Sequence, residues 1–167
     1  MIVVDRPARR WLASATSSVQ NGRPSSKGGT ESRPSGAIMA ARPETGIDLM
    51  VGVGGTPEGI ITACAMKALG GVIQGRLWPT TDEERQRALD AGHKLEAVLS
   101  TDDLVSGDDC FFMATGITDG ELLRGVRYTH SSARTQSLVM RSKSGTVRMI
   151  DARHRIDKLS AFAAVDY

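Results

Sequence analysis

The residues best suited to chemistry lie between Gly52 and Glu58, where the sequence reads G-V-G-G-T-P-E. The three glycines allow a tight turn and a close approach of backbone to a ligand. Thr56 is expected to cap a helix and Pro57 to occupy its first position. Free amides and the positive end of the helix dipole suit a phosphate group there. Glu58 adds a carboxylate, which is compatible with a phosphate when a divalent cation lies between them.

The same residues also allow a purely structural interpretation. Strand–glycine–helix turns occur in α/β proteins without a ligand, and a first-turn glutamate is often only a partner of the dipole. The spacing matches neither the dinucleotide fingerprint nor a P-loop, because no G-K-[ST] follows the glycines. The general rule that α/β sheets bind ligands at the carboxyl ends of strands keeps the ligand site open.

A strand and a helix must hold this turn in place. The apolar run predicts a strand over Ile47–Val53, and the following residues predict a helix over Pro57–Leu69 that Gly70 and Gly71 end. The side chains expected to be buried on this helix are Ile60, Ile61, Cys64, Met66 and Leu69.

The remaining elements indicate an α/β protein with a mixed sheet covered by helices. Strands are expected near residues 2–4, 72–77, 110–115 and 125–128, and a hairpin over 137–150 turns at Lys143-Ser144-Gly145. The pattern predicts a helix tail at 37–41, a turn of helix from residue 101, and a helix from Asp82 to Ala91. A capping box from Thr81 to Glu84 begins the last of these. Residues after Asp151 are expected to form a polar closing segment.

One segment does not fit a packed domain. From Ala8 to Ser35 the chain is mostly Ser, Arg, Gly, Pro and Thr, with no apolar period. Such a composition buries too little apolar surface to offset the entropy of ordering. We therefore expect residues 1–35 to be irregular and disordered, and residues 36–167 to form the ordered domain.

Composition and charge argue against several classes of protein. A net charge of +2 is too small to indicate nucleic acid binding, and an aromatic fraction of 4% requires a mainly aliphatic core. No stretch is apolar enough to span a membrane, and the first ten residues lack a signal-peptide pattern. Cys64 and Cys110 in apolar settings are typical of reduced core residues, so a cytoplasmic location is expected.

Other polar clusters favour structural roles. The pairs Asp102-Asp103 and Asp108-Asp109 are more often caps or solvated turns than metal ligands. The three histidines are isolated and no serine lies in a G-x-S-x-G context, so zinc and serine-nucleophile chemistry are not indicated. The basic stretch Arg141–Arg148 is expected to be the solvated face of a hairpin.

Several long motifs, in order, resemble one family. They are G-I-D-L-M-V-G-V-G-G-T-P-E-G, G-G-V-I-Q-G-R-L-W-P, S-T-D-D-L-V-S-G-D-D and A-T-G-I-T-D-G-E-L-L-R-G-V-R-Y. Together with T-Q-S-L-V-M-R-S-K-S-G-T-V-R-M-I-D, they resemble the C-terminal half of bacterial class II fructose-1,6-bisphosphatases over Gly36–Tyr167. The resemblance implies a truncated lithium-sensitive sugar phosphatase fold and a cytoplasmic, Mn²⁺- or Mg²⁺-dependent hydrolase of gluconeogenesis and glycerol metabolism.

The resemblance also implies residue roles. Glu58 matches the family's C-terminal metal ligand, Gly55 matches a glycine whose backbone meets the substrate, and Arg6 matches one residue of a substrate-binding R-P-R-H type motif. That motif breaks at Ala8, and the family's other acidic ligands lie in a half that has no counterpart here. No catalytic residue is therefore assigned.

The non-matching segment at about residues 8–35 begins inside one family motif and ends inside another. G-A-I at Gly36–Ile38 is the surviving end of D-G-D-V-A-G-A-I, while Glu31-Ser32-Arg33 stands near the place of its aspartates. We hypothesise that this segment is an out-of-frame translation. Reading the coding DNA in the other two frames should yield an apolar helix, a strand and D-G-D; the hypothesis fails if neither does.

The function that the resemblance implies is hydrolysis of the 1-phosphate of fructose 1,6-bisphosphate, with sedoheptulose bisphosphate left open as a further substrate. One carboxylate cannot hold a pair of cations, because hard divalent ions need several oxygen ligands, so this chain alone is expected to have little or no activity. An alternative is a non-catalytic module that associates with an intact subunit. A third is a phosphate-binding module without catalysis. The expected partner is a sugar bisphosphate, with neither nucleic acid nor membrane, and a homo-oligomer is left open.

Overall fold

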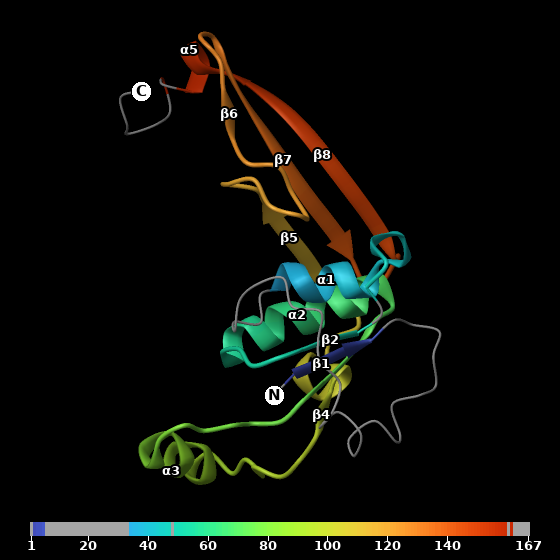
Figure 1. The fold of residues 1–167 in the computed structure, drawn as a ribbon, viewed down its shortest axis with the longest axis vertical. Coiled ribbons are helices and arrows are strands. Elements are labelled where there is room, and N and C mark those ends of the chain that lie inside the picture. The colour runs from blue at the N-terminus through green and yellow to red at the C-terminus, as the bar shows by residue number, and fades with distance from the viewer. Residues whose placement is uncertain (1, 6–33, 48, 160, 162–167) are drawn as a thin grey trace.

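The fold places a pair of helices between two antiparallel sheets (Figure 1). It is described here from a computed structural model that covers residues 2–5, 34–47, 49–159 and 161. The expected irregular segment 1–35 lies largely outside these residues; its described ends are a strand at Ile2–Asp5 and the start of a helix at Pro34. The predicted α+β class is confirmed, with the strands divided between two sheets.

The first sheet has the order β2-β1-β3-β4, in which every neighbouring pair is antiparallel. Its strands are β1 (Ile2–Asp5), β2 (Leu49–Gly52), β3 (Val72–Gly75) and β4 (Leu99–Ser100). Because β1 pairs with both β2 and β3, these two strands run parallel to each other on either side of it. The chain crosses from β2 to β3 through α2 (Thr56–Leu69), so this helix lies over the sheet.

The second sheet is built on the long hairpin β7 (Ser132–Arg141) and β8 (Thr146–Arg155). One edge of β7 pairs along its whole length with β8. The other edge pairs first with β6 (Arg127–Tyr128) and then with β5 (Phe111–Thr115). The predicted hairpin is confirmed, and Gly145 adopts the left-handed φ of 57° that its turn requires. The expected polar closing segment after Asp151 is wrong at its start, because β8 continues to Arg155.

The core lies between the sheets, where α1 (Pro34–Ala41) packs against α2. Alanines at the contact let the two helix backbones approach closely. Bulkier apolar side chains from both sheets complete the core. Its fully buried large side chains are Ile38, Met66, Ile73, Leu138 and Met140.

The α2 helix ends as expected but buries a different side. Gly70 has the left-handed φ of 71° and donates its N–H to the carbonyl of Met66, which stops the helix. The predicted burial of Ile60 and Ile61 is wrong, since they are 36% and 47% exposed. Because α2 carries apolar residues on more than one side, its periodicity could not select the buried one. The side that is buried consists of Gly59, Thr62, Ala63, Ala65, Met66 and Ala68.

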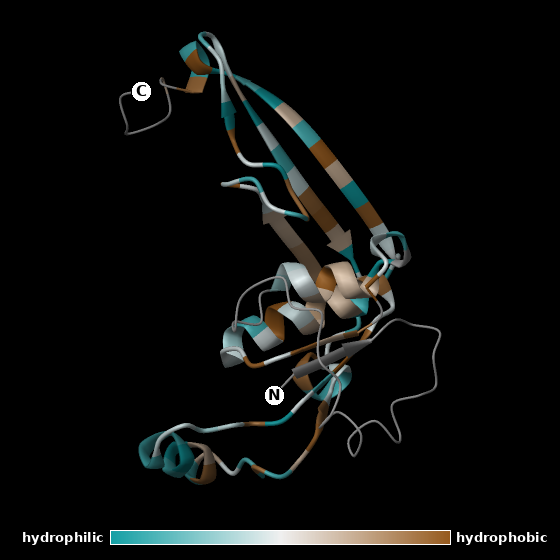
Figure 2. Cartoon of the chain, in the orientation of Figure 1, coloured by the Kyte–Doolittle hydropathy of each residue, from teal (hydrophilic) through white to brown (hydrophobic). Residues whose placement is uncertain are grey.

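The α3 helix (Asp82–Asp90) lies away from both sheets and has no buried residue, as its charged face predicted (Figures 1 and 2). Only half of the expected capping box forms. The Thr81 hydroxyl accepts the N–H of Glu84, but the Glu84 carboxylate accepts the N–H and hydroxyl of Thr80 instead of closing on Thr81. The described residues also form three short helices: a 3-10 turn at Pro43–Thr45, α4 (Thr101–Leu104) and α5 (Ile156–Leu159).

Candidate functional site

The predicted turn joins β2 to α2, but its cap is shifted by one residue. Gly55, with an extended backbone at φ −66° and ψ 158°, is the N-cap. Thr56 is the first helical residue, so the expectation of a threonine cap is wrong. The shift moves Pro57 to the second helical position, where its missing N–H still belongs to the unpaired first turn.

The helix start therefore presents backbone donors toward solvent. The N–H groups of Thr56 and Glu58 have no intrahelical carbonyl before them, whereas Gly59 donates to the carbonyl of Gly55 over 3.1 Å. All residues from Val53 to Glu58 are exposed. Two free amides at the positive end of a fourteen-residue helix form a surface that suits an anion.

The Glu58 side chain folds back over Gly55. A Cβ at position 55 would lie 3.3 Å from the Glu58 Cδ and closer still to Oε2. The Glu58 backbone is held by Thr62, whose buried hydroxyl donates to the Glu58 carbonyl over 2.7 Å. The structure therefore brings together the two residues that the sequence analysis singled out, a carboxylate and a bare backbone at one helix start.

The close contact described at this turn involves Gly55. Gly52, Gly54 and Gly55 all have negative φ, so none of them is needed for a left-handed turn. A side chain at position 55 would displace the Glu58 carboxylate, which is the flexible end of an exposed side chain. The third residue assigned from the resemblance, Arg6, lies outside the described residues.

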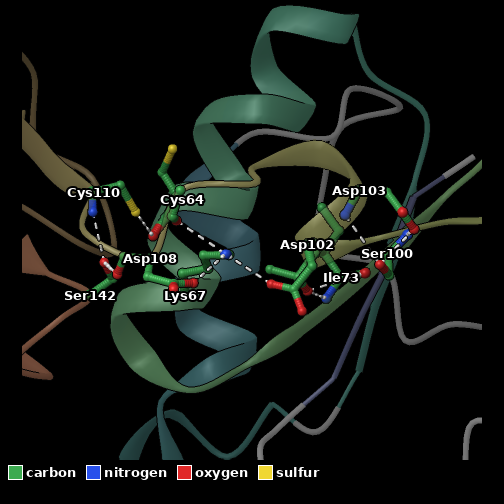
Figure 3. A network of polar contacts seen from close by, with 11 residues as sticks. Cys64, Lys67, Ile73, Ser100, Asp102, Asp103, Asp108, Cys110 and Ser142 are labelled. Atoms are coloured by element: carbon green, nitrogen blue, oxygen red, sulfur yellow. Dashed lines mark hydrogen bonds and ion pairs between the residues drawn. The ribbon is translucent and has the colours of Figure 1, made fainter.

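The acidic pairs form ion pairs and caps, in line with their structural interpretation (Figure 3). Lys67 lies between Asp102 and Asp108, with its Nζ 2.8 Å and 3.9 Å from their carboxylates, and the hydrogen bond to Asp102 raises its pKa. Asp103 exchanges hydrogen bonds with Ser100 at the start of α4, which lowers its pKa. Asp109 binds Arg141 through two parallel hydrogen bonds of 2.8 and 2.5 Å.

The two cysteines, distant in sequence, are neighbours in space. The Cys110 thiol contacts the Cys64 carbonyl, with 3.8 Å between sulfur and oxygen. Burial raises the pKa of the Cys64 thiol, and the neighbouring Cys110 raises it further. Both are free thiols that are partly buried between α2 and β5, where they serve packing.

A group of arginines on and beside the second sheet was not singled out from the sequence. Arg124, Arg127, Arg134 and Arg153 line one cavity of about 390 Å³, together with Gln136 and Asp151. The signal was an arginine between small or apolar neighbours in V-R-Y, A-R-T and A-R-H. Strand register was needed to bring these three tripeptides together.

Comparison with known proteins identifies the family of this chain. The family model described as bacterial fructose-1,6-bisphosphatase, glpX-encoded, matches residues 26–154, which is well over half of the chain. The chain belongs to this family. The match begins before Gly36, where the resemblance in the motifs began, and ends before Tyr167.

The curated relatives agree with this assignment. The chain is 38% identical over 137 residues to a protein named fructose-1,6-bisphosphatase class 2 from Haemophilus influenzae, covering 74% of the chain and 41% of the relative. Two Synechococcus proteins, named D-fructose 1,6-bisphosphatase class 2/sedoheptulose 1,7-bisphosphatase, are 39% identical over 141 residues, covering 77% of the chain and 41% of each relative. The chain thus spans about two fifths of their length. By name, these relatives are phosphoric monoester hydrolases.

Within the described residues, no helix combines the length and the hydropathy that crossing a bilayer requires.

Proposed function

We propose that this chain supplies a phosphate-binding turn and one metal ligand to an enzyme that hydrolyses the 1-phosphate of fructose 1,6-bisphosphate. Glu58 is the ligand of a Mn²⁺ or Mg²⁺ ion, and the backbone at Gly55 meets the substrate. The observation that carries the proposal is the Glu58 carboxylate folded over Gly55 at a helix start with free amides. The products are fructose 6-phosphate and phosphate, and the reaction belongs to cytoplasmic gluconeogenesis and glycerol metabolism.

The described residues fit this metal only in part. Mg²⁺ and Mn²⁺ require several oxygen ligands, and Glu58 is the only carboxylate of the turn. In the portion that the structure describes, no three or more His, Cys, Asp or Glu residues group closely enough to hold an ion. The proposal therefore assigns the other ligands to polypeptide outside the described residues, and no catalytic step is derived from Glu58 alone.

It follows that the isolated chain has little or no phosphatase activity. Fructose 1,6-bisphosphate and Mn²⁺ should give no turnover with the chain by itself. Adding the amino-terminal part of the Haemophilus influenzae relative should restore turnover that Glu58→Gln abolishes. Turnover by the isolated chain that Glu58→Gln abolishes would refute the predicted inactivity.

A binding measurement on the reconstituted complex separates metal binding at Glu58 from turnover. Mn²⁺ held jointly by Glu58 and the added amino-terminal part should broaden the phosphorus NMR signal of inorganic phosphate, and Glu58→Gln should remove the broadening. If the broadening is unchanged in Glu58→Gln, the metal lies elsewhere and the proposed role of Glu58 is refuted. Stabilisation by phosphate in the presence of a chelator would instead support a phosphate-binding module without catalysis.

A second function is favoured by an uncovered apolar surface on the second sheet. Strand register places Phe111 and Met113 of β5 on the face opposite the buried Phe112, and Ile150 of β8 joins them there. These three side chains are 61%, 72% and 43% exposed, and apolar residues recur along β5 and β8 (Figure 2). Exposed apolar patches mark interaction sites. The chain would then be a module that associates with an intact subunit of its own family.

Co-purification with the full-length Haemophilus influenzae relative tests this second function. Met113→Lys should abolish co-purification, whereas Val98→Lys, at a site 57% exposed and outside the second sheet, should not. If the unsubstituted chain, Met113→Lys and Val98→Lys all co-purify equally well, this surface is excluded as the contact. Sedimentation of the chain without the relative shows whether Met113→Lys changes self-association into a homo-oligomer.

A further inference from the structure

Three arginines form one row across the second sheet. Register pairs Arg127 of β6 directly with Arg134 of β7, and Arg134 directly with Arg153 of β8. Directly opposed residues in antiparallel strands project from the same face with their Cβ atoms about 5 Å apart. Like charges in such positions are destabilising, so the row is an unfavourable arrangement unless an anion or solvent offsets it.

The row forms one wall of the cavity of about 390 Å³. Arg124 lies beside it, and its backbone N–H donates to the side chain of Gln136 over 2.9 Å. Gln136 in turn donates to the Asp151 carboxylate over 3.1 Å, which fixes the position of both side chains. A cavity of this size matches the lower range of small-molecule sites, roughly 300–1,000 Å³.

The charge balance in this cavity is positive. Arg127 is paired with Asp119, with 3.1 Å between nitrogen and oxygen. Among the described residues, Arg124, Arg134 and Arg153 have no ion-pair partner for their guanidinium groups. Asp151 is the one carboxylate in the described lining, and Gln136 already engages it.

We infer that this arginine cavity binds a small anion that carries at least two phosphate groups. Guanidinium groups bind phosphate through paired hydrogen bonds, and several together match a polyanion better than a single charge. A binding anion would also offset the repulsion within the row. None of the lining residues belongs to α2 or to the turn before it, so this site is separate from the one at Glu58.

Calorimetric titration with pyrophosphate, at low ionic strength and with a chelator present, tests the inference. Pyrophosphate should bind the full chain more tightly than inorganic phosphate. The double substitution Arg134→Gln/Arg153→Gln should weaken binding at least tenfold. The matched control is Arg148→Gln, on the opposite face of β8, where the pairing partner is Val139; it should change binding less than twofold.

Three further variants keep the result interpretable. Arg153→Lys preserves the charge but not the paired geometry, and it should weaken binding several-fold. Glu58→Gln should leave pyrophosphate binding unchanged, so failure of the proposed function and failure of this inference are distinguishable. Without anion, Arg134→Gln should unfold at a higher temperature than the unsubstituted chain, because it relieves like-charge repulsion.

Three results would overturn the inference: no binding of pyrophosphate, equal weakening by Arg148→Gln and the double substitution, or binding of an acidic peptide in place of pyrophosphate. The first excludes the site, the second reduces it to general surface charge, and the third assigns the arginines to a protein partner.

Discussion

The carboxylate of Glu58 occupies the place where a side chain at position 55 would lie, with its Cδ 3.3 Å from the site of a Cβ. A glycine at position 55 leaves room for this carboxylate at the helix start. The backbone at Gly55 and the carboxylate at Glu58 thereby lie together at the end of α2 that carries the positive dipole.

Gly55→Ala should disturb Glu58 without unfolding the chain. Alanine tolerates φ −66° and ψ 158°, so the free energy of unfolding should fall by no more than about 1 kcal/mol, the scale of a helix cap. In the complex with the amino-terminal part of the Haemophilus influenzae relative, the displaced carboxylate should weaken Mn²⁺ binding by about tenfold, as expected when a metal ligand loses its orientation. Calorimetry measures the affinity. The control is Gly107→Ala, where a Cβ meets nothing within 4 Å; equal losses in both variants would contradict the prediction.

Gly125→Ala should destabilise the loop beside the arginine cavity. A Cβ there would lie 2.6 Å from the carbonyl carbon of Thr118 and 2.7 Å from the amide nitrogen of Asp119. Both are backbone atoms that cannot rotate away, so a loss of about 1–3 kcal/mol is expected from overpacking. Urea unfolding measures it. Gly120→Ala is the matched control, because its nearest neighbour would lie at an ordinary 3.7 Å, and an equal change in the two variants would contradict this account.

The ion pair between Asp109 and Arg141 should contribute stability that depends on pH. Hydrogen bonding to Arg141 lowers the pKa of Asp109 below its unfolded value, which is about 3.9. The contribution is therefore full above about pH 4 and is lost as the pH falls through the lowered pKa.

The measurement compares the unfolding midpoint with that of Asp109→Asn between about pH 7 and pH 2, across the unfolded pKa near 3.9. The midpoint difference should shrink as acid is added, and added salt should reduce it because both side chains are partly exposed. Glu121→Gln, at an exposed loop position, is the control. A difference that stays constant down to the lowest pH would rule out the ion pair as its source.

Ser100→Ala should weaken the start of α4. The Ser100 hydroxyl accepts the N–H of Asp103, and the Asp103 carboxylate accepts the N–H of Ser100 over 2.8 Å. Loss of this capping box should lower the free energy of unfolding by about 1 kcal/mol. Chemical denaturation checks the value. Ser106→Ala, nearby and exposed, should have no measurable effect, and the prediction fails if the two serines behave alike.

Much of the local structure follows from the sequence. The end of α2 at Gly70, the hairpin turn at Gly145 and the helix at Asp82 each depend on signals within a few residues. Family membership likewise follows from contiguous motifs. The helix cap nevertheless lies at Gly55 and not at the predicted Thr56, because adjacent residues are similarly suited to begin the helix.

Tertiary structure decided which faces and which distant residues meet. It inserted β1 between β2 and β3, left Ile60 and Ile61 exposed, and aligned Arg127, Arg134 and Arg153 in one row. The sequence determined the turns, helix ends and family because these depend on neighbours along the chain. Strand order, buried face and the arginine row depend on pairing between residues far apart, and a shift of one residue in register would send every side chain of a strand to the opposite face.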